Sequence, residues 1–190
     1  IKIEKLYFNN KNEGRYRDAI LEGIVSQGYQ AFSEVKRCDL LIKEGQEHQS
    51  DLRVEMKYYY DFDVKKSMVD VDLDLELENE KSLATSIFND CFSDKKPCDV
   101  FLMVVHQGIS EEYEKKSKTY GIDSSYIKNR RKFNEGFDVR ESVEKFLTQL
   151  ERRYRGEGNS IELNVSHYPI SVCINDKAVS HHFLVEVIRI

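Results

Sequence analysis

The chain has 190 residues, which suits one domain that buries roughly 70% of the surface exposed in the unfolded chain. Hydrophobic residues make up 40% and charged residues 33%, with two prolines and nine glycines, so the composition excludes a disordered chain and is typical of a globular protein. The net charge of −5 argues against a general nucleic-acid coat protein, and no apolar run approaches the ~20 residues of a membrane span.

The first part of the chain predicts a helix followed by three strands. Apolar residues at helical spacing predict a helix over 16–28, which Gly28 is placed to end. A short strand is expected at "YQAFSEV", residues 29–35, and a compact apolar strand at "CDLLIK", residues 38–43. The polar turn "EGQEHQSD" then leads into the strand "LRVEMKYYY", residues 52–60.

The second part predicts a helix, a buried strand, a helix and a hairpin. Residues 79–92 have helical periodicity, and "CDVFLMVVH", residues 98–106, is the most apolar stretch of the chain. Asp138 and Glu141 resemble a capping box before a long apolar stripe, and "INDKAV" is typical of a hairpin turn near the C-terminus. The order predicts an α/β fold in one domain, 1–190, with a mixed central sheet flanked by helices and a C-terminal helix and β-hairpin.

Two acids and a lysine on the neighbouring strands 38–43 and 52–60 form the candidate site. If these strands pair through the polar turn, Asp39 and Glu55 converge on one side of the sheet, and Lys57 lies on the same face as Glu55. Two adjacent carboxylates favour a shared proton or a divalent cation. The two carboxylates and the Met56 backbone carbonyl suit Mg²⁺, for which Mn²⁺ is expected to substitute, and Lys57 would stabilise phosphorane charge or position water.

This pattern resembles the PD-(D/E)XK nuclease superfamily, which has the restriction-endonuclease-like fold. "CDLLI" and "VEMK" fill the places of its second-strand acid and third-strand E-x-K motif, and the resemblance covers about residues 12–106, leaving 107–190 as a helical and hairpin elaboration. It implies an α-β-β-β-α-β core, metal binding by Asp39 and Glu55, and catalysis by Lys57. Cys38 stands where the motif has proline.

The resemblance also implies an additional acid from the first helix. Glu22 is the residue chosen for this metal ligand, with Glu13 and Asp18 as competitors. Asp51 is a rival to Asp39, but its position in a turn explains it without a metal.

Two charged segments remain outside this site. Strict alternation from Val69 to Glu78 predicts an amphipathic edge strand whose acidic face, 70–78, is either a solvated surface or a contact for a partner protein or a second copy. A basic segment with interleaved tyrosines is a candidate nucleic-acid surface, with a solvated face as the alternative. Its basic residues are Lys115, Lys116, Lys118, Lys128, Arg130, Arg131 and Lys132.

The sequence thus predicts a cytoplasmic Mg²⁺-dependent endonuclease. Its four cysteines, none in a C-x-x-C pair, suit free thiols in a reducing compartment, and no signal peptide is visible. DNA is the expected substrate ahead of RNA, and restriction, defence, repair or mobile-element processing are the processes expected. The alternatives are a catalytically inactive nuclease-like module that binds nucleic acid or protein, and an interaction protein that uses its acidic segment.

Overall fold

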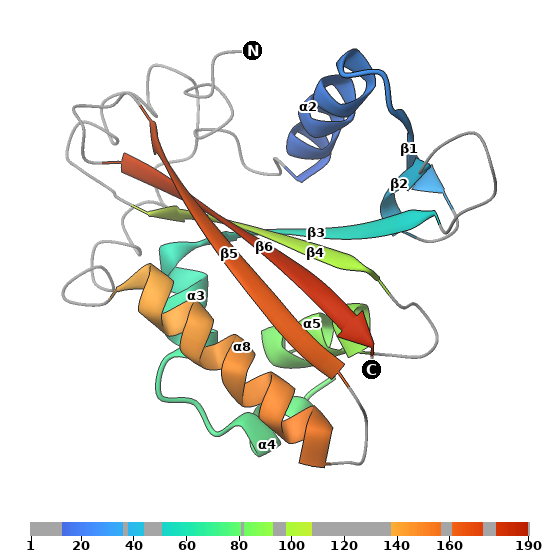
Figure 1. The fold of residues 1–190 in the computed structure, drawn as a ribbon. Helices are drawn as coiled ribbons and strands as arrows, with labels where there is room; N and C mark the ends of the chain where they lie inside the picture. Colours follow the sequence, from blue (N-terminus) through green and yellow to red (C-terminus); the bar gives the residue numbers. More distant parts are fainter. Residues whose placement is uncertain are drawn as a thin grey trace.

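The protein is an α/β fold in which helices cover both faces of a six-stranded mixed sheet, as seen in a computed structural model (Figure 1). The structure describes residues 13–35, 38–43, 51–80, 82–92, 98–107, 138–156, 161–172 and 178–189. The predicted fold class, a mixed central sheet flanked by helices, is therefore confirmed. The basic segment 115–132 lies outside the described residues.

The sheet has the strand order β1-β2-β3-β4-β6-β5. The first three strands follow helix α2 (Glu13–Ser26) and are antiparallel to one another: β1 (Gln30–Val35), β2 (Cys38–Lys43) and β3 (Leu52–Tyr60). The other three are β4 (Val100–Gln107), which is parallel to β3, and the antiparallel hairpin of β5 (Ile161–Val172) and β6 (Ala178–Arg189). The predicted strands 38–43 and 52–60 are confirmed residue for residue.

Two cores lie on opposite faces of this sheet. On the α2 face, Tyr16 packs with buried residues of β2, β3 and β4, among them Leu40 and Met56. On the other face, a larger core joins the sheet to three helices, and its fully buried members include Phe146 and Phe183. These helices are α3 (Asp61–Met68), α5 (Leu83–Phe92) and α8 (Val139–Gly156). Figure 1 shows this arrangement, with α2 on one side of the sheet and the other described helices on the opposite side. Because side chains alternate along a strand, successive residues of β3 point toward opposite faces of the sheet.

The long helix α8 (Val139–Gly156) confirms the predicted C-terminal helix. Its buried residues are the predicted stripe, Val139, Val143, Phe146, Leu147, Leu150 and Tyr154. Asp138 begins the helix, because its Oδ1 accepts a hydrogen bond from the Glu141 backbone N–H at 2.9 Å. Within the described ranges, no helix is both long enough and apolar enough to cross a membrane.

The predicted edge strand over 69–78 is wrong, because this segment contains the short helix α4 (Leu73–Glu78). The Asp72 carboxylate caps it by accepting from the backbone N–H groups of Asp74 and Leu75. Strict alternation also contains pairs four residues apart, and Leu73 and Leu77 use that spacing to pack against the core. The acidic strand proposed as a partner surface does not form, and Asp74 instead pairs with Arg153 of α8 at 2.8 Å.

Helices α3 (Asp61–Met68) and α5 (Leu83–Phe92) complete the second face. The sequence patterns did not predict α3, which has two buried apolar residues one turn apart, Val64 and Met68. The helix predicted over 79–92 begins later, at Leu83, because the Ser82 Oγ accepts from the Thr85 backbone N–H at 3.0 Å and caps it there.

Candidate functional site

Asp39 lies where β2 and β3 stop pairing with each other. Their register runs from Ile42↔Leu52 to Leu40↔Val54. Farther along β3, the Met56 backbone N–H donates a 2.8 Å hydrogen bond to Asp39 Oδ2. The carboxylate of β2 is therefore fixed beside the Glu55–Met56 peptide, as the candidate site requires.

Glu55 and Lys57 share one face of β3, as their spacing predicted. Their neighbours Val54 and Met56 are buried in the α2 core, so the two charged side chains lie on the opposite face. Lys57 Nζ is 3.3 Å from Glu55 Oε1, and the exposed fractions of the two side chains are 21% and 18%. The pair is thus part-buried in the middle of a central strand.

Asp90 of α5 is a third acid at this site, which the sequence patterns did not single out. Its Oδ2 lies 3.1 Å from Lys57 Nζ, and its side chain is 16% exposed. The ammonium group of Lys57 therefore lies between two carboxylates, one from β3 and one from α5.

Negative charge exceeds positive charge around Glu55. The pKa of the Glu55 carboxyl is raised to about 7: burial is the largest cause, the negative charges of Asp39 and Asp90 also raise it, and Lys57 lowers it. The charge of Asp39 contributes to this shift, and the hydrogen bond from the Met56 N–H places Asp39 beside the residue next to Glu55. A divalent cation would relieve this repulsion.

The first helix brings an arginine to the site. Arg17 of α2 lies with its Nη1 4.0 Å from Asp39 Oδ1 and 2.6 Å from Glu34 Oε1. Glu22, the predicted additional ligand, is exposed on α2, and Asp18 is an exposed partner of Arg17 at 3.5 Å. The assignment of Glu22 to the metal stays a prediction.

The carboxylates of Asp39 and Glu55 are hard oxygen donors of the kind that Mg²⁺ prefers. Among the described residues, no group of three or more His, Cys, Asp or Glu side chains is arranged to hold a metal ion. Mg²⁺ commonly uses one or two carboxylates and keeps several waters, so a two-carboxylate site fits this ion better than it fits Zn²⁺. The Met56 carbonyl belongs to the residue whose N–H binds Asp39 and stays the predicted third donor.

Asp51, the rival to Asp39, lies directly before the first residue of β3, at the opposite end of the β2–β3 pairing from Asp39. It directly precedes Leu52 and is four residues from Glu55, which corresponds to about 13 Å along an extended strand. Asp39, in contrast, contacts the residue next to Glu55. The structure therefore favours Asp39 as the partner of Glu55.

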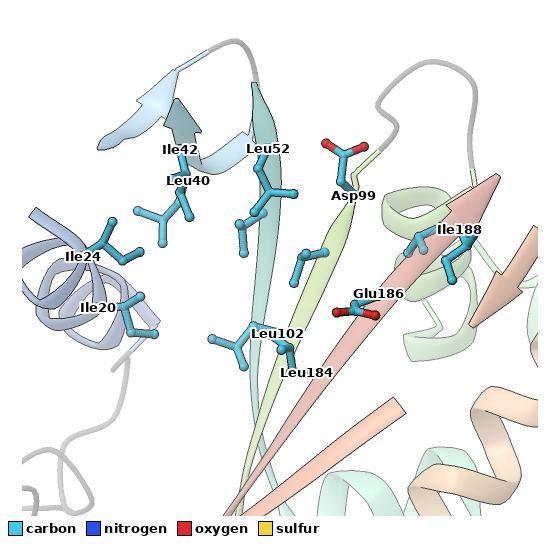
Figure 2. Close-up of a pocket in the computed structure, with 13 residues that line it drawn as sticks. Ile20, Ile24, Leu40, Ile42, Leu52, Asp99, Leu102, Leu184, Glu186 and Ile188 are labelled. Carbon is cyan, nitrogen blue, oxygen red and sulfur yellow. The ribbon is translucent and has the colours of Figure 1, made fainter. Parts of the chain in front are cut away.

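A cavity of about 550 Å³ lies on the opposite face of the sheet, between α2 and β6 (Figure 2). Its lining is mostly aliphatic and includes Ile20 and Ile24 of α2 and Leu52 of β3, with Asp99 and Glu186 as its charged members. Such a lining suits apolar groups and offers no close pair of carboxylates with a lysine. The α5 face of β3, with its two part-buried carboxylates and lysine, is therefore the better candidate for a functional site.

One signal in the sequence could have identified Asp90. It lies between Ile87 and Cys91 in the apolar stripe of the predicted helix 79–92, and a carboxylate in such a stripe needs a partner.

Comparison with known proteins finds no family model, no curated protein and no solved structure that matches the chain. The function is therefore inferred from the geometry of the site.

Proposed function

We propose that the protein is a Mg²⁺-dependent nuclease that hydrolyses phosphodiester bonds, with DNA as its substrate. The observation that carries this proposal is the convergence of Asp39, Glu55 and Lys57 at one end of the β2–β3 pairing. A repelling pair of carboxylates next to an ammonium group combines a place for a divalent cation with a fixed positive charge.

Each residue has a distinct role in this proposal. Asp39 and Glu55 hold the ion, which supplies charge neutralisation and an activated water when bound. Asp39 is oriented by the Met56 N–H, so its other oxygen, Oδ1, which lies 4.0 Å from Arg17 Nη1, keeps a defined direction. Lys57 places positive charge next to Glu55, where it stabilises the charge that develops on the attacked phosphate.

The topology supports the same proposal. The resemblance implies an α-β-β-β-α-β core with the acid on the second strand and E-x-K on the third. Helix α2, the antiparallel strands β1, β2 and β3, helix α5 and the parallel strand β4 occur in a compatible order, with α3 and α4 added between β3 and α5. Asp39 lies on the second strand and Glu55 and Lys57 lie on the third.

Plasmid cleavage with Mg²⁺ or Mn²⁺ tests the proposal, with EDTA as the negative control. Lys57→Met keeps much of the bulk of the side chain and removes its charge. We expect it to retain the fold and to cut the cleavage rate by about 100-fold or more, the usual scale for losing one preorganised charge.

A different result for Lys57→Met would contradict the catalytic role of Lys57. If Lys57 only neutralises Glu55 and Asp90, Lys57→Met should be destabilised, because two part-buried carboxylates lose their partner. Thermal melts and cleavage assays on the same preparation separate the two roles. A destabilised variant with full activity per folded molecule would refute the assignment, and wild-type protein without metal-dependent cleavage of DNA or RNA would refute the nuclease function.

A further inference from the structure

Asp90 occupies a position on α5 that an apolar side chain would ordinarily fill. Ala84 and Ile87 are fully buried against the sheet, and Asp90 follows Ile87 by three residues, so it lies on the same side of the helix. Burying a carboxylate there is unfavourable unless a partner compensates. A carboxylate at this position therefore needs a positively charged or hydrogen-bonding partner.

The contact of Asp90 is the ammonium group of Lys57, 3.1 Å away. Among the described residues, no donor is directed at Asp90 Oδ2 with hydrogen-bond geometry, so the contact is an ion pair. Lys57 Nζ also lies 3.3 Å from Glu55 Oε1, so two carboxylates from different elements restrict it. A lysine side chain has several rotatable bonds, and two anchors reduce the conformations that its charge can adopt.

The two carboxylates that contact Lys57, those of Glu55 and Asp90, have different roles in the proposed reaction. Glu55 is next to Asp39 and belongs to the proposed ion site, so a bound cation and Lys57 compete for the same carboxylate. Asp90 contacts Lys57 from α5 and is not one of the ligands in the proposed ion site. It remains as an anchor for the ammonium group when Glu55 is engaged.

We propose that Asp90 is a positioning residue that holds the Lys57 ammonium group in place beside Glu55. This inference rests on the proposed nuclease function for its catalytic consequence, and on the Lys57–Asp90 contact for its structural part. Asp90 does not touch the substrate phosphate in this arrangement. It acts through Lys57, by keeping that charge where phosphate charge develops.

The test compares Asp90→Asn, which removes the charge at nearly constant volume, with Asp90→Glu, which keeps it. We expect Asp90→Asn to lower kcat about 10- to 100-fold with KM changed less than about twofold, and Asp90→Glu to recover part of the loss. Asp90→Asn should add little to the loss in Lys57→Met, because both act through one charge. Asp74→Asn, which breaks the surface pair with Arg153, is the matched control and should leave kcat unchanged.

A second readout does not depend on activity. In ¹⁵N NMR of the full chain, the Lys57 ammonium signal, assigned by its loss in Lys57→Met, should be detectable in the wild type and broadened or lost in Asp90→Asn. A folded Asp90→Asn protein with an unchanged signal and unchanged kcat would overturn the proposal. If the wild type cleaves no nucleic acid, the nuclease function fails, and the ammonium signal still decides whether Asp90 fixes Lys57.

Discussion

Replacing Glu55 with glutamine should change how the stability of the protein depends on pH. Glu55 has a pKa of about 7 in the folded protein, against an ordinary value of 4.5. The folded state therefore holds this proton more tightly than the unfolded state does. The stabilising effect of the proton is fully present below pH 4.5 and is lost as the pH rises to 7.

The expected magnitude follows from the two pKa values. Each pKa unit is worth about 1.4 kcal/mol, so ionising Glu55 should lower the free energy of unfolding by about 3 kcal/mol between pH 4.5 and pH 7.5. Glu55→Gln cannot ionise and lacks this loss. The variant should therefore gain about 3 kcal/mol relative to the wild type across this pH range.

Urea denaturation in EDTA at several pH values between 4.5 and 7.5 measures this difference. Glu162→Gln, a replacement at an exposed glutamate on β5, is the matched control and should follow the wild type. Subtracting the wild-type curve from each variant removes the contributions of histidines and other acids. Parallel wild-type and Glu55→Gln curves would show that Glu55 is well solvated and is not repelled by Asp39, which would remove the electrostatic argument for an ion site.

Three further predictions address the ion, the substrate surface and the core. Mn²⁺ at 100 times its Kd should stabilise the wild type by about 2.7 kcal/mol in thermal melts. Asp39→Asn, which keeps an acceptor for the Met56 N–H, should lose this stabilisation. An equal stabilisation of the variant would place the ion elsewhere. Reversing Lys128, Arg130 and Arg131 to glutamate should weaken DNA binding and reduce the slope of log K against log salt by about 3, and an unchanged slope would return this segment to a solvated role. Phe146→Ala should cost about 3–5 kcal/mol in chemical denaturation because Phe146 is fully buried, and a loss below about 1 kcal/mol would contradict its place in the core.

Patterns with one dominant period predicted their elements well. In β3, apolar and polar residues alternate, and pairing with β2 leaves one face for the core, so its bounds follow from the sequence. In α8, the spacing of the buried stripe is helical over several turns, and Asp138 marks the start. These signals are local, and no distant contact overrides them in the structure.

The errors arose where local signals were ambiguous or where the deciding partner was distant. The alternation in 69–78 contained helical spacing as well, and the cap formed by Asp72 favoured the helix. The convergence of Asp39 and Glu55 was predictable because a short connection joins their strands. Asp90 reaches Lys57 only through the packing of α5 on the sheet, which the periodicity of neither element specifies.

The early end of the pairing between β2 and β3 has a consequence for the motions of the native state. β2 joins the rest of the sheet from Leu40↔Val54 to Ile42↔Leu52, whereas β5 and β6 pair from Ile161↔Arg189 to Val172↔Ala178. The hairpin of β1 and β2 should therefore open as a separate cooperative unit, and its amide hydrogens should exchange with solvent before those of β4 and β6. Because Asp39 travels with this hairpin while Glu55 stays in the sheet, such opening would transiently separate the two carboxylates.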